Sequence, residues 1–194
     1  VDVDYENLPS WERESFTAFA RELAADLRAL GLASSVTVQP KSGESVSRGP
    51  GAMDWNALCA AADRLQVMLY NEHNAATEPG PIASLDWISG VVDYGLRACP
   101  AAKLVPVLKV SGMDWGPDKA EWRSFADVAS RLAAERAKPR RERYNRVPWF
   151  VYQGSDGRHV VYYEDARSLA AKAGRLRSRG IATIVLWSLG SEDP

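Results

Sequence analysis

Apolar and polar residues alternate along this chain with two different periods, and each change of period predicts a change of element. Short runs rich in β-branched residues predict five strands, at residues 1–5, 36–39, 65–70, 104–110 and 181–187. Stretches with helical spacing predict helices between the strands, at residues 11–30, after Asp54 as N-cap, and at 85–99, 119–137 and 165–179. Gly31 and Gly180 stand where glycine commonly follows a helix. Because parallel strands need long crossovers, this order predicts an α/β fold with a parallel sheet.

One segment departs from the order of strand and helix. Two strand-like runs, residues 149–153 and 158–163, flank the turn sequence Gly-Ser-Asp-Gly at residues 154–157. This pattern is typical of an antiparallel hairpin. We expect the hairpin to be inserted before the last helix and to lie outside the parallel sheet.

The spacing of the strands predicts a (β/α)₈ TIM barrel, because one strand follows another after about 30 residues, the length of one βα unit. A whole barrel takes about 250 residues. The 194 residues would supply about strands 4 to 8 of a single catalytic domain, residues 1–194. Because open parallel edges leave backbone groups unpaired, we expect the N-terminal βα units to be missing from this sequence.

Composition and charge narrow the classes of partner. Hydrophobic residues make up 46% of the chain, which excludes a disordered protein. Lys and Arg number 24 against 25 Asp and Glu, and this balance argues against a nucleic-acid partner. No apolar run reaches the roughly 20 residues that a membrane span needs, and no signal peptide opens the chain.

Two local features leave alternatives open. Residues 131–146 are rich in arginine, which favours a solvated helix end and loop over a contact with an acidic polymer. Cys59 and Cys99 lie in helical patterns, which favours two small buried hydrophobic residues over a disulfide. The redox compartment therefore stays undecided.

The first predicted strand carries carboxylates at Asp2, Asp4 and Glu6, with apolar residues between them. All three acids share one face, because side chains alternate along a strand. Closely packed carboxylates cannot all ionise easily, so we expect one of them to have a raised pKa and to serve as a general acid. Glu6 is at the C-terminal end of the strand, where barrel enzymes place their chemistry. A solvated edge strand is the alternative explanation.

Polar and aromatic residues follow the later strands at the same end: Tyr70, Asn71, Glu72, His73, Met113, Asp114, Trp115 and Trp187. Each of them alone is more typical of packing than of a ligand contact. Together with the carboxylates they indicate a sugar site, where flat aromatic faces stack on pyranose rings.

These motifs resemble family 18 of the glycoside hydrolases, the chitinase-like group. The opening VDVDYEN resembles the second half of the family signature Asp-Gly-x-Asp-x-Asp-x-Glu, and VMLYNEH, EPGPIASLDW and IVLWSLGSEDP resemble later segments. The order and spacing of the segments are closest to the bacterial branch of spore-cortex and cell-wall lytic enzymes. The resemblance implies a retaining mechanism in which the 2-acetamido group of the substrate is the nucleophile.

The resemblance also implies roles for the carboxylates and for one tyrosine. Glu6 would protonate the glycosidic oxygen and later activate water. Asp4 would orient the acetamido N–H and stabilise positive charge, and Asp2 would share a proton with Asp4. Tyr70 would hold the acetamido oxygen.

Four further residues would bind the sugar. Trp187 matches the tryptophan that forms the floor of the subsite beside the scissile bond. Asn71 departs from the family, which usually has aspartate there, and this puts the rate or the pH optimum in doubt more than binding. Trp115 and His73 are expected as rim contacts, with a structural hydrogen bond as the favoured alternative for His73.

The expected activity is hydrolysis of β-1,4-linked N-acetylglucosamine polymers, either peptidoglycan or chitin, outside the cell or in its envelope. The alternative is a lectin of the same family, which the retained Glu6 disfavours because non-catalytic members usually lose this acid. A phosphate-binding barrel is disfavoured, because it would need a glycine-rich loop at a strand end and this sequence has none. We expect no cofactor and no metal, because His73 and His159 lie far apart in the chain.

Overall fold

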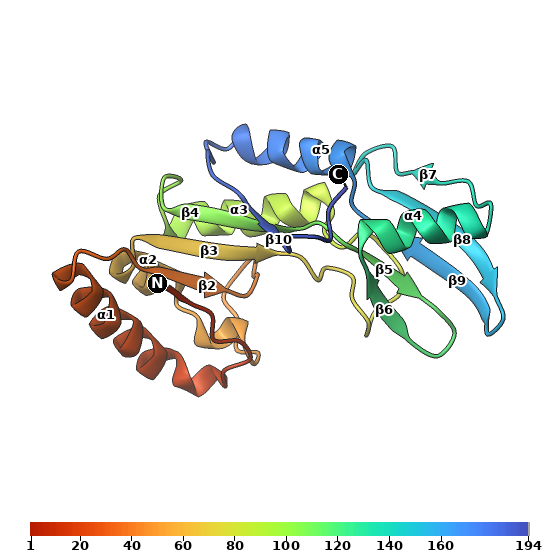
Figure 1. Cartoon of the computed structure of the whole chain (residues 1–194). Coiled ribbons are helices and arrows are strands. Elements are labelled where there is room, and N and C mark those ends of the chain that lie inside the picture. The colour runs from red at the N-terminus through yellow and green to blue at the C-terminus, as the bar shows by residue number, and fades with distance from the viewer. Residues whose placement is uncertain (194) are drawn as a thin grey trace. The chain divides into compact units, whose positions relative to one another are not determined.

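The computed structural model describes residues 1–193, and the chain divides into two compact units (Figure 1). The first unit comprises Val1–Leu69, Ser89–Val107 and Leu176–Val185. The second unit comprises Tyr70–Ile88, Leu108–Arg175 and Leu186–Pro194.

A five-stranded sheet in the order β1-β2-β3-β4-β10 confirms the five strands expected from the sequence. The strands are β1 (Asp2–Val3), β2 (Ser35–Val38), β3 (Arg64–Leu69), β4 (Leu104–Lys109) and β10 (Val185–Trp187). β1 pairs with β2 and β2 with β3 in parallel, with Asp2 opposite Ser35 and Ser35 opposite Arg64. β1 and β10 are shorter than expected. The curled parallel sheet is part of a barrel of the TIM type, as predicted.

Helices follow the strands at the expected places: α1 (Arg13–Ala29), α2 (Trp55–Ala61), α3 (Leu85–Ala98) and α5 (Ala166–Arg177), with 3-10 turns at Ser10–Glu12 and Pro50–Ala52. The Asp54 carboxylate accepts a hydrogen bond from the Ala57 N–H at 3.0 Å and caps α2, as predicted. Gly31 and Gly180 have φ of 72° and 80°, the left-handed backbone expected after a helix. Among residues 1–193, no helix is both long and apolar enough to cross a membrane.

Cys59 and Cys99 form a disulfide, with their Cα atoms 5.7 Å apart, so the preference for two separate thiols was wrong. Both side chains are buried, as that interpretation required. The two cysteines are 40 positions apart in sequence and meet only because α2 and the end of α3 pack in the same unit. A helical pattern around each cysteine carries no information about this meeting.

The second unit contains a separate antiparallel sheet in the order β6-β5-β9-β8-β7. Its strands are β5 (Gly112–Trp115), β6 (Ala120–Arg123), β7 (Arg140–Arg141), β8 (Pro148–Gly154) and β9 (Gly157–Tyr162). The β8–β9 hairpin is the predicted one and lies outside the parallel sheet. Its loop has two residues instead of four, because Gly154 pairs directly with Gly157.

The predicted helix at 119–137 is wrong in its first part. Residues 120–123 form β6, which pairs with β5, and α4 (Phe125–Ala134) begins only after Ser124. The Ser124 hydroxyl accepts from the Asp127 N–H at 3.1 Å and the Asp127 carboxylate accepts from the Ser124 N–H at 3.0 Å, a reciprocal cap that starts the helix there. α4 covers one face of the antiparallel sheet (Figure 1) and buries Val128 among Phe150, Tyr152, Val161 and Tyr163.

Reduction of the Cys59–Cys99 disulfide should lower the free energy of unfolding by about 2–4 kcal/mol, because the bond limits the conformations of the unfolded chain. For a chain of this size the expected fall in Tm is roughly 5–15 °C. Thermal unfolding followed by circular dichroism, with and without dithiothreitol, measures it. The Cys59→Ala/Cys99→Ala variant is the control, and its Tm should not respond to the reductant. An unchanged Tm of the parent on reduction would contradict the prediction.

Candidate active site

The three carboxylates of the opening segment belong to the first unit and alternate with apolar residues as predicted. Val3 is buried, whereas Asp2, Asp4 and Glu6 are exposed. The Tyr5 ring packs on the aromatic side chains of α1, with its centroid 5.7 Å from that of Phe19. Val3 and one face of the half-exposed Tyr5 ring therefore pack on the unit, Val1 stays exposed, and the acids point to the other side.

Asp2 is anchored by three hydrogen bonds from neighbouring strands. Its Oδ1 accepts from the Ser35 hydroxyl at 2.5 Å and from the Gln66 side-chain amide at 2.7 Å, and its Oδ2 accepts from the Thr37 hydroxyl at 2.8 Å. Parallel pairing of β1, β2 and β3 places these three donors on the same face as Asp2. The carboxylate is therefore held in one position as a hydrogen-bond acceptor.

Asp4 is the carboxylate whose pKa is raised. Partial burial contributes most, and the negative charges of Glu6 and Asp2 add to it, because all three disfavour the ionised form. The sequence predicted a raised pKa for one of the three closely spaced acids, and in the structure the pKa of Asp4, the middle one, is raised. Asp4 thus keeps its proton to a higher pH than an ordinary aspartate.

The backbone after Glu6 is fixed by a pair of amide side chains. Asn7 has φ of 56°, in the left-handed region that asparagine tolerates better than most residues. Its N–H donates to the Gln39 side-chain oxygen at 3.1 Å, and the Gln39 side-chain N–H₂ donates back to the Asn7 side-chain oxygen at 3.4 Å. The pair ties the segment that carries Glu6 to the end of β2. Sequence reasoning did not identify Gln39 as a residue that supports the site. The available signal was the position of Asn7, its partner, directly after Glu6.

Tyr70 and Asn71 follow β3 and belong to the second unit. The ammonium group of Lys109 lies 5.7 Å from the centroid of the half-buried Tyr70 ring, and burial lowers the pKa of Lys109. Asn71 is exposed and has φ of 72°, while its carbonyl accepts from the Asn74 side chain at 3.2 Å. Asparagine and aspartate are both enriched in this backbone region, so the local geometry accepts the usual family residue as well.

The loop after Asn71 holds His73 and Glu72 in structural contacts. Nδ1 of His73 lies 3.1 Å from the Glu78 carbonyl oxygen, which supports the structural alternative considered for this residue. The Glu72 carboxylate accepts from the N–H and the hydroxyl of Ser84, the residue that precedes α3. Glu72 therefore fixes the start of that helix, a contact that no local pattern in the sequence showed.

The two tryptophans expected at the rim differ in exposure. Trp115 is only 6% exposed, and its indole N–H donates to the Asn74 carbonyl at 3.1 Å. Trp187 is 52% exposed, and its backbone carbonyl accepts from the Val110 N–H at 2.9 Å. Trp187 therefore offers an open aromatic surface, whereas most of Trp115 is enclosed by protein.

The expected site residues thus fall into two sets. The structure brings the three acids together in the first unit, and it places the remaining five in the second unit: Tyr70, Asn71, His73, Trp115 and Trp187. The local contacts within each set are as described above. The catalytic and sugar-binding roles of all eight stay predictions.

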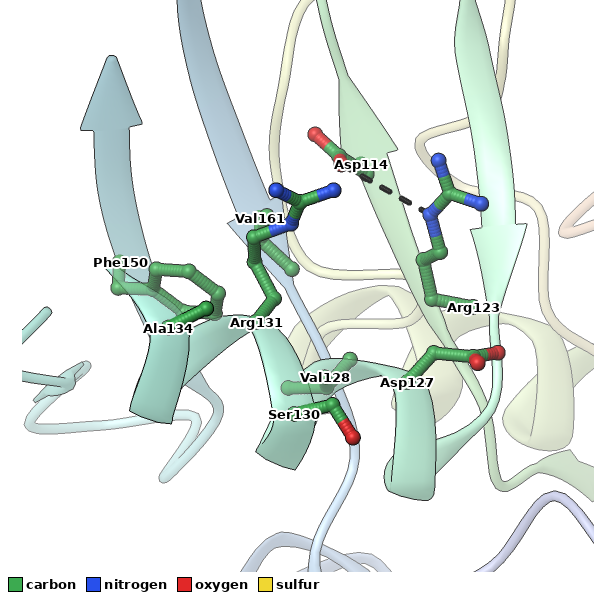
Figure 2. A pocket seen from close by; sticks show the side chains of 9 residues that line it. All are labelled: Asp114, Arg123, Asp127, Val128, Ser130, Arg131, Ala134, Phe150 and Val161. Atoms are coloured by element: carbon green, nitrogen blue, oxygen red, sulfur yellow. Dashed lines mark ion pairs between the residues drawn. The ribbon is translucent and has the colours of Figure 1, made fainter. Parts of the chain in front are cut away.

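A polar pocket of about 310 Å³ lies in the second unit, lined by α4 and four strands of the antiparallel sheet (Figure 2). Asp114 is 3% exposed, and Nε of Arg123 lies 3.8 Å from its Oδ2. The aliphatic and aromatic side chains of Val128, Phe150 and Val161 form the apolar part of the lining. Figure 2 shows a buried carboxylate with an arginine beside it at the polar end of this pocket.

Asp114 is satisfied by a chain of hydrogen bonds across the sheet. It accepts from the Tyr152 hydroxyl at 2.7 Å, and Nδ1 of His159 lies 2.8 Å from its other oxygen. Nε2 of His159 lies 2.9 Å from the Asp156 carboxylate in the hairpin loop. Burial works to lower the His159 pKa, but the hydrogen bonds to Asp156 and Asp114 outweigh it, so the pKa is raised. His159 therefore links the exposed hairpin loop to the buried aspartate.

The sequence reasoning missed this cluster because it considered His159 only as a metal ligand and Asp114 only as a rim residue. The available signal for the cluster was the alternation of side chains along residues 112–115 and 158–163. Once these strands pair, the alternation places Asp114 and His159 on the same face of the sheet. Within residues 1–193, no group of three or more His, Cys, Asp or Glu side chains could hold a metal ion.

The curled parallel sheet, with acids at alternate positions of the segment that begins with its first strand, defines this chain as part of a TIM-type (β/α) barrel. The family model for glycosyl hydrolases family 18 matches residues 1–193, and the chain belongs to that family.

The proteins it is similar to include cortical fragment-lytic enzymes and chitinases. The cortical fragment-lytic enzyme of Bacillus subtilis (strain 168) is 27% identical over 202 residues, which covers 100% of this chain and 47% of that protein. The crystal structure of a chitinase from Chromobacterium violaceum ATCC 12472 is 36% identical, with a TM-score of 0.92 over 99% of this chain and 62% of that chain. The Bacillus cereus spore cortex-lytic enzyme SleL shares the fold, with a TM-score of 0.89 at 24% identity over 98% of this chain and 46% of that chain. The chain spans about half the length of the curated relatives it matches.

Replacing Asp4 by asparagine should raise the free energy of unfolding at pH 7 and change it least at pH 3. The folded chain holds the Asp4 proton above the ordinary pKa of 3.8, so the contribution of Asp4 to stability falls as the pH rises from that value through the folded pKa. Asparagine cannot ionise and escapes this loss. Urea denaturation of parent and variant at both pH values measures the difference. A difference between variant and parent that is independent of pH, or larger at pH 3, would contradict the prediction.

Proposed function

We propose that the protein is a glycoside hydrolase that cleaves β-1,4 linkages in polymers containing N-acetylglucosamine. The observation that carries the proposal is the row of acids on one face of the opening segment, with Glu6 at its end and a raised pKa at Asp4. Membership of family 18 supports this interpretation, because the opening segment resembles the second half of the family signature.

In the proposed mechanism the substrate supplies its own nucleophile. Glu6 donates its proton to the glycosidic oxygen while the acetamido carbonyl oxygen attacks the anomeric carbon, so the leaving sugar departs as an alcohol. The product of this step is a cyclic oxazolinium ion. Glu6, now a carboxylate, takes a proton from water, and the water oxygen attacks the anomeric carbon from the side the leaving group vacated. The bond between the anomeric carbon and the acetamido oxygen breaks in this step, so the ring opens and the neutral acetamido group is restored. The anomeric configuration is therefore retained.

The other two acids support the positive charge of that intermediate. Asp4 would hold the acetamido N–H, and its raised pKa makes it able to share a proton with Asp2. The three hydrogen bonds to Asp2 keep that carboxylate in place while charge develops nearby. Tyr70 would donate its hydroxyl proton to the acetamido oxygen, and Trp187 would stack on the sugar ring through its exposed face.

The names of the relatives support polymers of the bacterial wall or chitin as substrates. One relative is a cortical fragment-lytic enzyme and a structural neighbour is a chitinase. Both names are consistent with an N-acetylglucosamine-containing polysaccharide, acted on outside the cell or in its envelope. We further propose that residues 1–194 are the C-terminal part of the catalytic barrel, because its parallel sheet has five strands where a TIM barrel has eight.

A sugar-binding protein without turnover is the second candidate function. Asn71 favours it, because an amide at this position brings no negative charge where the family usually has aspartate. The retained Glu6 favours the hydrolase.

Replacing Glu6 by glutamine should reduce hydrolysis of a chromogenic N-acetylglucosamine oligomer by at least about 10²–10⁴-fold, because the amide cannot transfer a proton. Affinity for the oligomer, measured by calorimetry, should stay within a few-fold of the parent. The assay uses a protein in which the eight-stranded barrel is complete, with the exposed Glu22→Gln as matched control. Residual activity within a few-fold of the parent would refute the assignment of Glu6, and absence of activity in the parent would favour the lectin.

The Asn71→Asp variant should keep or raise the turnover of the same oligomer. Aspartate tolerates the left-handed backbone at this position and restores the negative charge usual in the family. Initial rates across a pH series separate a change in kcat from a shift of the pH optimum. Loss of all activity in a variant with an unchanged melting temperature would show that asparagine has its own role here.

A further inference from the structure

A hollow of the second unit, of about 620 Å³, is lined by three cationic side chains, one tryptophan and the apolar residues Pro139, Phe150 and Val151. The cations and the tryptophan are Lys138, Arg140, Arg158 and Trp149, and this hollow is called the basic hollow. Lys138 and Arg140 come from the segment around β7, Trp149 from β8 and Arg158 from β9. All three cations are exposed. The basic hollow uses part of the arginine-rich stretch for which a contact with an acidic polymer was the alternative explanation.

No carboxylate lines the basic hollow, and within the part of the chain that is described none of its three cations has a carboxylate partner. The contrast with the next residue is direct, because Arg141 pairs with the Asp165 carboxylate. Acids close in sequence are already engaged, as Asp156 is with His159. The three positive charges are therefore available to a ligand.

An aromatic row crosses the sheet beside these charges. Arg140 and Trp149 are directly opposite across β7 and β8, and the guanidinium carbon lies 5.3 Å from the Trp149 ring centroid. Trp149 stacks on Tyr162 of β9, with centroids 5.8 Å apart and planes 13° from parallel. A cation next to a flat aromatic surface suits a ligand that carries a negative charge on a sugar.

The basic hollow continues along the sheet. Arg158 also lines an adjoining hollow of about 390 Å³, whose lining includes Trp115 and Lys119 together with the acids Glu78 and Asp118. The excess of positive charge is therefore confined to the basic hollow. Two hollows that share a wall suit an extended polymer better than a single small molecule.

Protection of a sheet edge accounts for only part of this arrangement. Lysine and arginine on an edge strand discourage pairing with another chain, and β7 is an edge strand of its sheet. Arg158 lies on β9, which has neighbours on both sides. Edge protection therefore gives no reason for Arg158 to converge on Lys138 and Arg140.

We propose that the basic hollow binds the carboxylates of an acidic glycan strand, so that the polymer recognised is of the peptidoglycan type and not neutral chitin. The inference rests on the proposed function for the N-acetylglucosamine backbone of that polymer. Charge complementarity carries the choice, because chitin has no carboxylate for three cations to meet. Each contact between exposed charges is weak and screened by salt, so recognition depends on several of them acting along the strand.

The test measures binding in the Glu6→Gln background, so that hydrolysis cannot alter the polymer. The ligands are insoluble peptidoglycan stripped of phosphate polymers by hydrofluoric acid, the same material before stripping, and chitin. The Lys138→Gln/Arg140→Gln/Arg158→Gln variant should bind stripped peptidoglycan about tenfold more weakly, which corresponds to about 1.4 kcal/mol. Its affinity for chitin should not change.

A matched control removes the same charge elsewhere. Arg48, Arg64 and Arg177 are exposed arginines of the first unit, and replacing all three by glutamine should leave both affinities within twofold of the parent. Conversion of the peptidoglycan carboxylates to amides should weaken parent binding as much as the triple substitution in the basic hollow does. Raising NaCl from 0.05 to 0.5 M should remove the advantage of peptidoglycan over chitin.

Several outcomes would overturn the proposal. Equal losses in both triple variants would show that net charge alone matters, and an equal loss on chitin would show that the hollow binds neutral sugar. Binding that depends on the phosphate polymers would identify a phosphate-bearing occupant. Failure of the hydrolase proposal would appear in the oligomer assay of Glu6 and would leave these binding ratios unchanged, so the two failures are distinguishable.

Discussion

Parallel pairing of β1, β2 and β3 is the constraint on which the candidate active site depends. It places Asp2 opposite Ser35 and Thr37 opposite Gln66, so that Asp2 meets hydroxyl and amide donors from β2 and β3. With Asp2 fixed, Asp4 and Glu6 follow on the same face, and burial together with the negative charges of Glu6 and Asp2 raises the pKa of Asp4. The grouping of the three acids is therefore a consequence of strand register.

In the second unit, too, hydrogen bonds hold a carboxylate in place, but the donors come from the antiparallel sheet. Asp114 is more deeply buried than any acid of the opening segment, and it is satisfied by Tyr152 and His159 from the paired strands β8 and β9. Burial of a carboxylate is costly unless hydrogen bonds replace its water. This requirement explains why a histidine with a raised pKa lies between Asp114 and the hairpin loop.

Positive side chains gather at one place on this protein although its net charge is close to zero. The net charge of −1 indicates no attraction to an acidic polymer, yet Lys138, Arg140 and Arg158 gather in one hollow without a carboxylate in its lining. Their acidic counterparts lie elsewhere, many of them in ion pairs such as Arg141–Asp165. A sum over the sequence cannot show such a separation, because strands distant in the chain bring the like charges together.

The sequence by itself determined the periodic features: the five parallel strands, the caps at Asp54 and Gly31, the β8–β9 hairpin and the alternation of acids at Asp2, Asp4 and Glu6. These depend on local backbone preference and on side-chain alternation, which a few neighbouring residues encode. Only the tertiary structure decided the Cys59–Cys99 disulfide, the pairing that makes residues 120–123 a strand, and the Asp114–His159 contact. The disulfide and the Asp114–His159 contact join residues 40 and 45 positions apart, and residues 120–123 form a strand only by pairing with the neighbouring β5. In each case the energy comes from a partner outside the segment whose local pattern was considered.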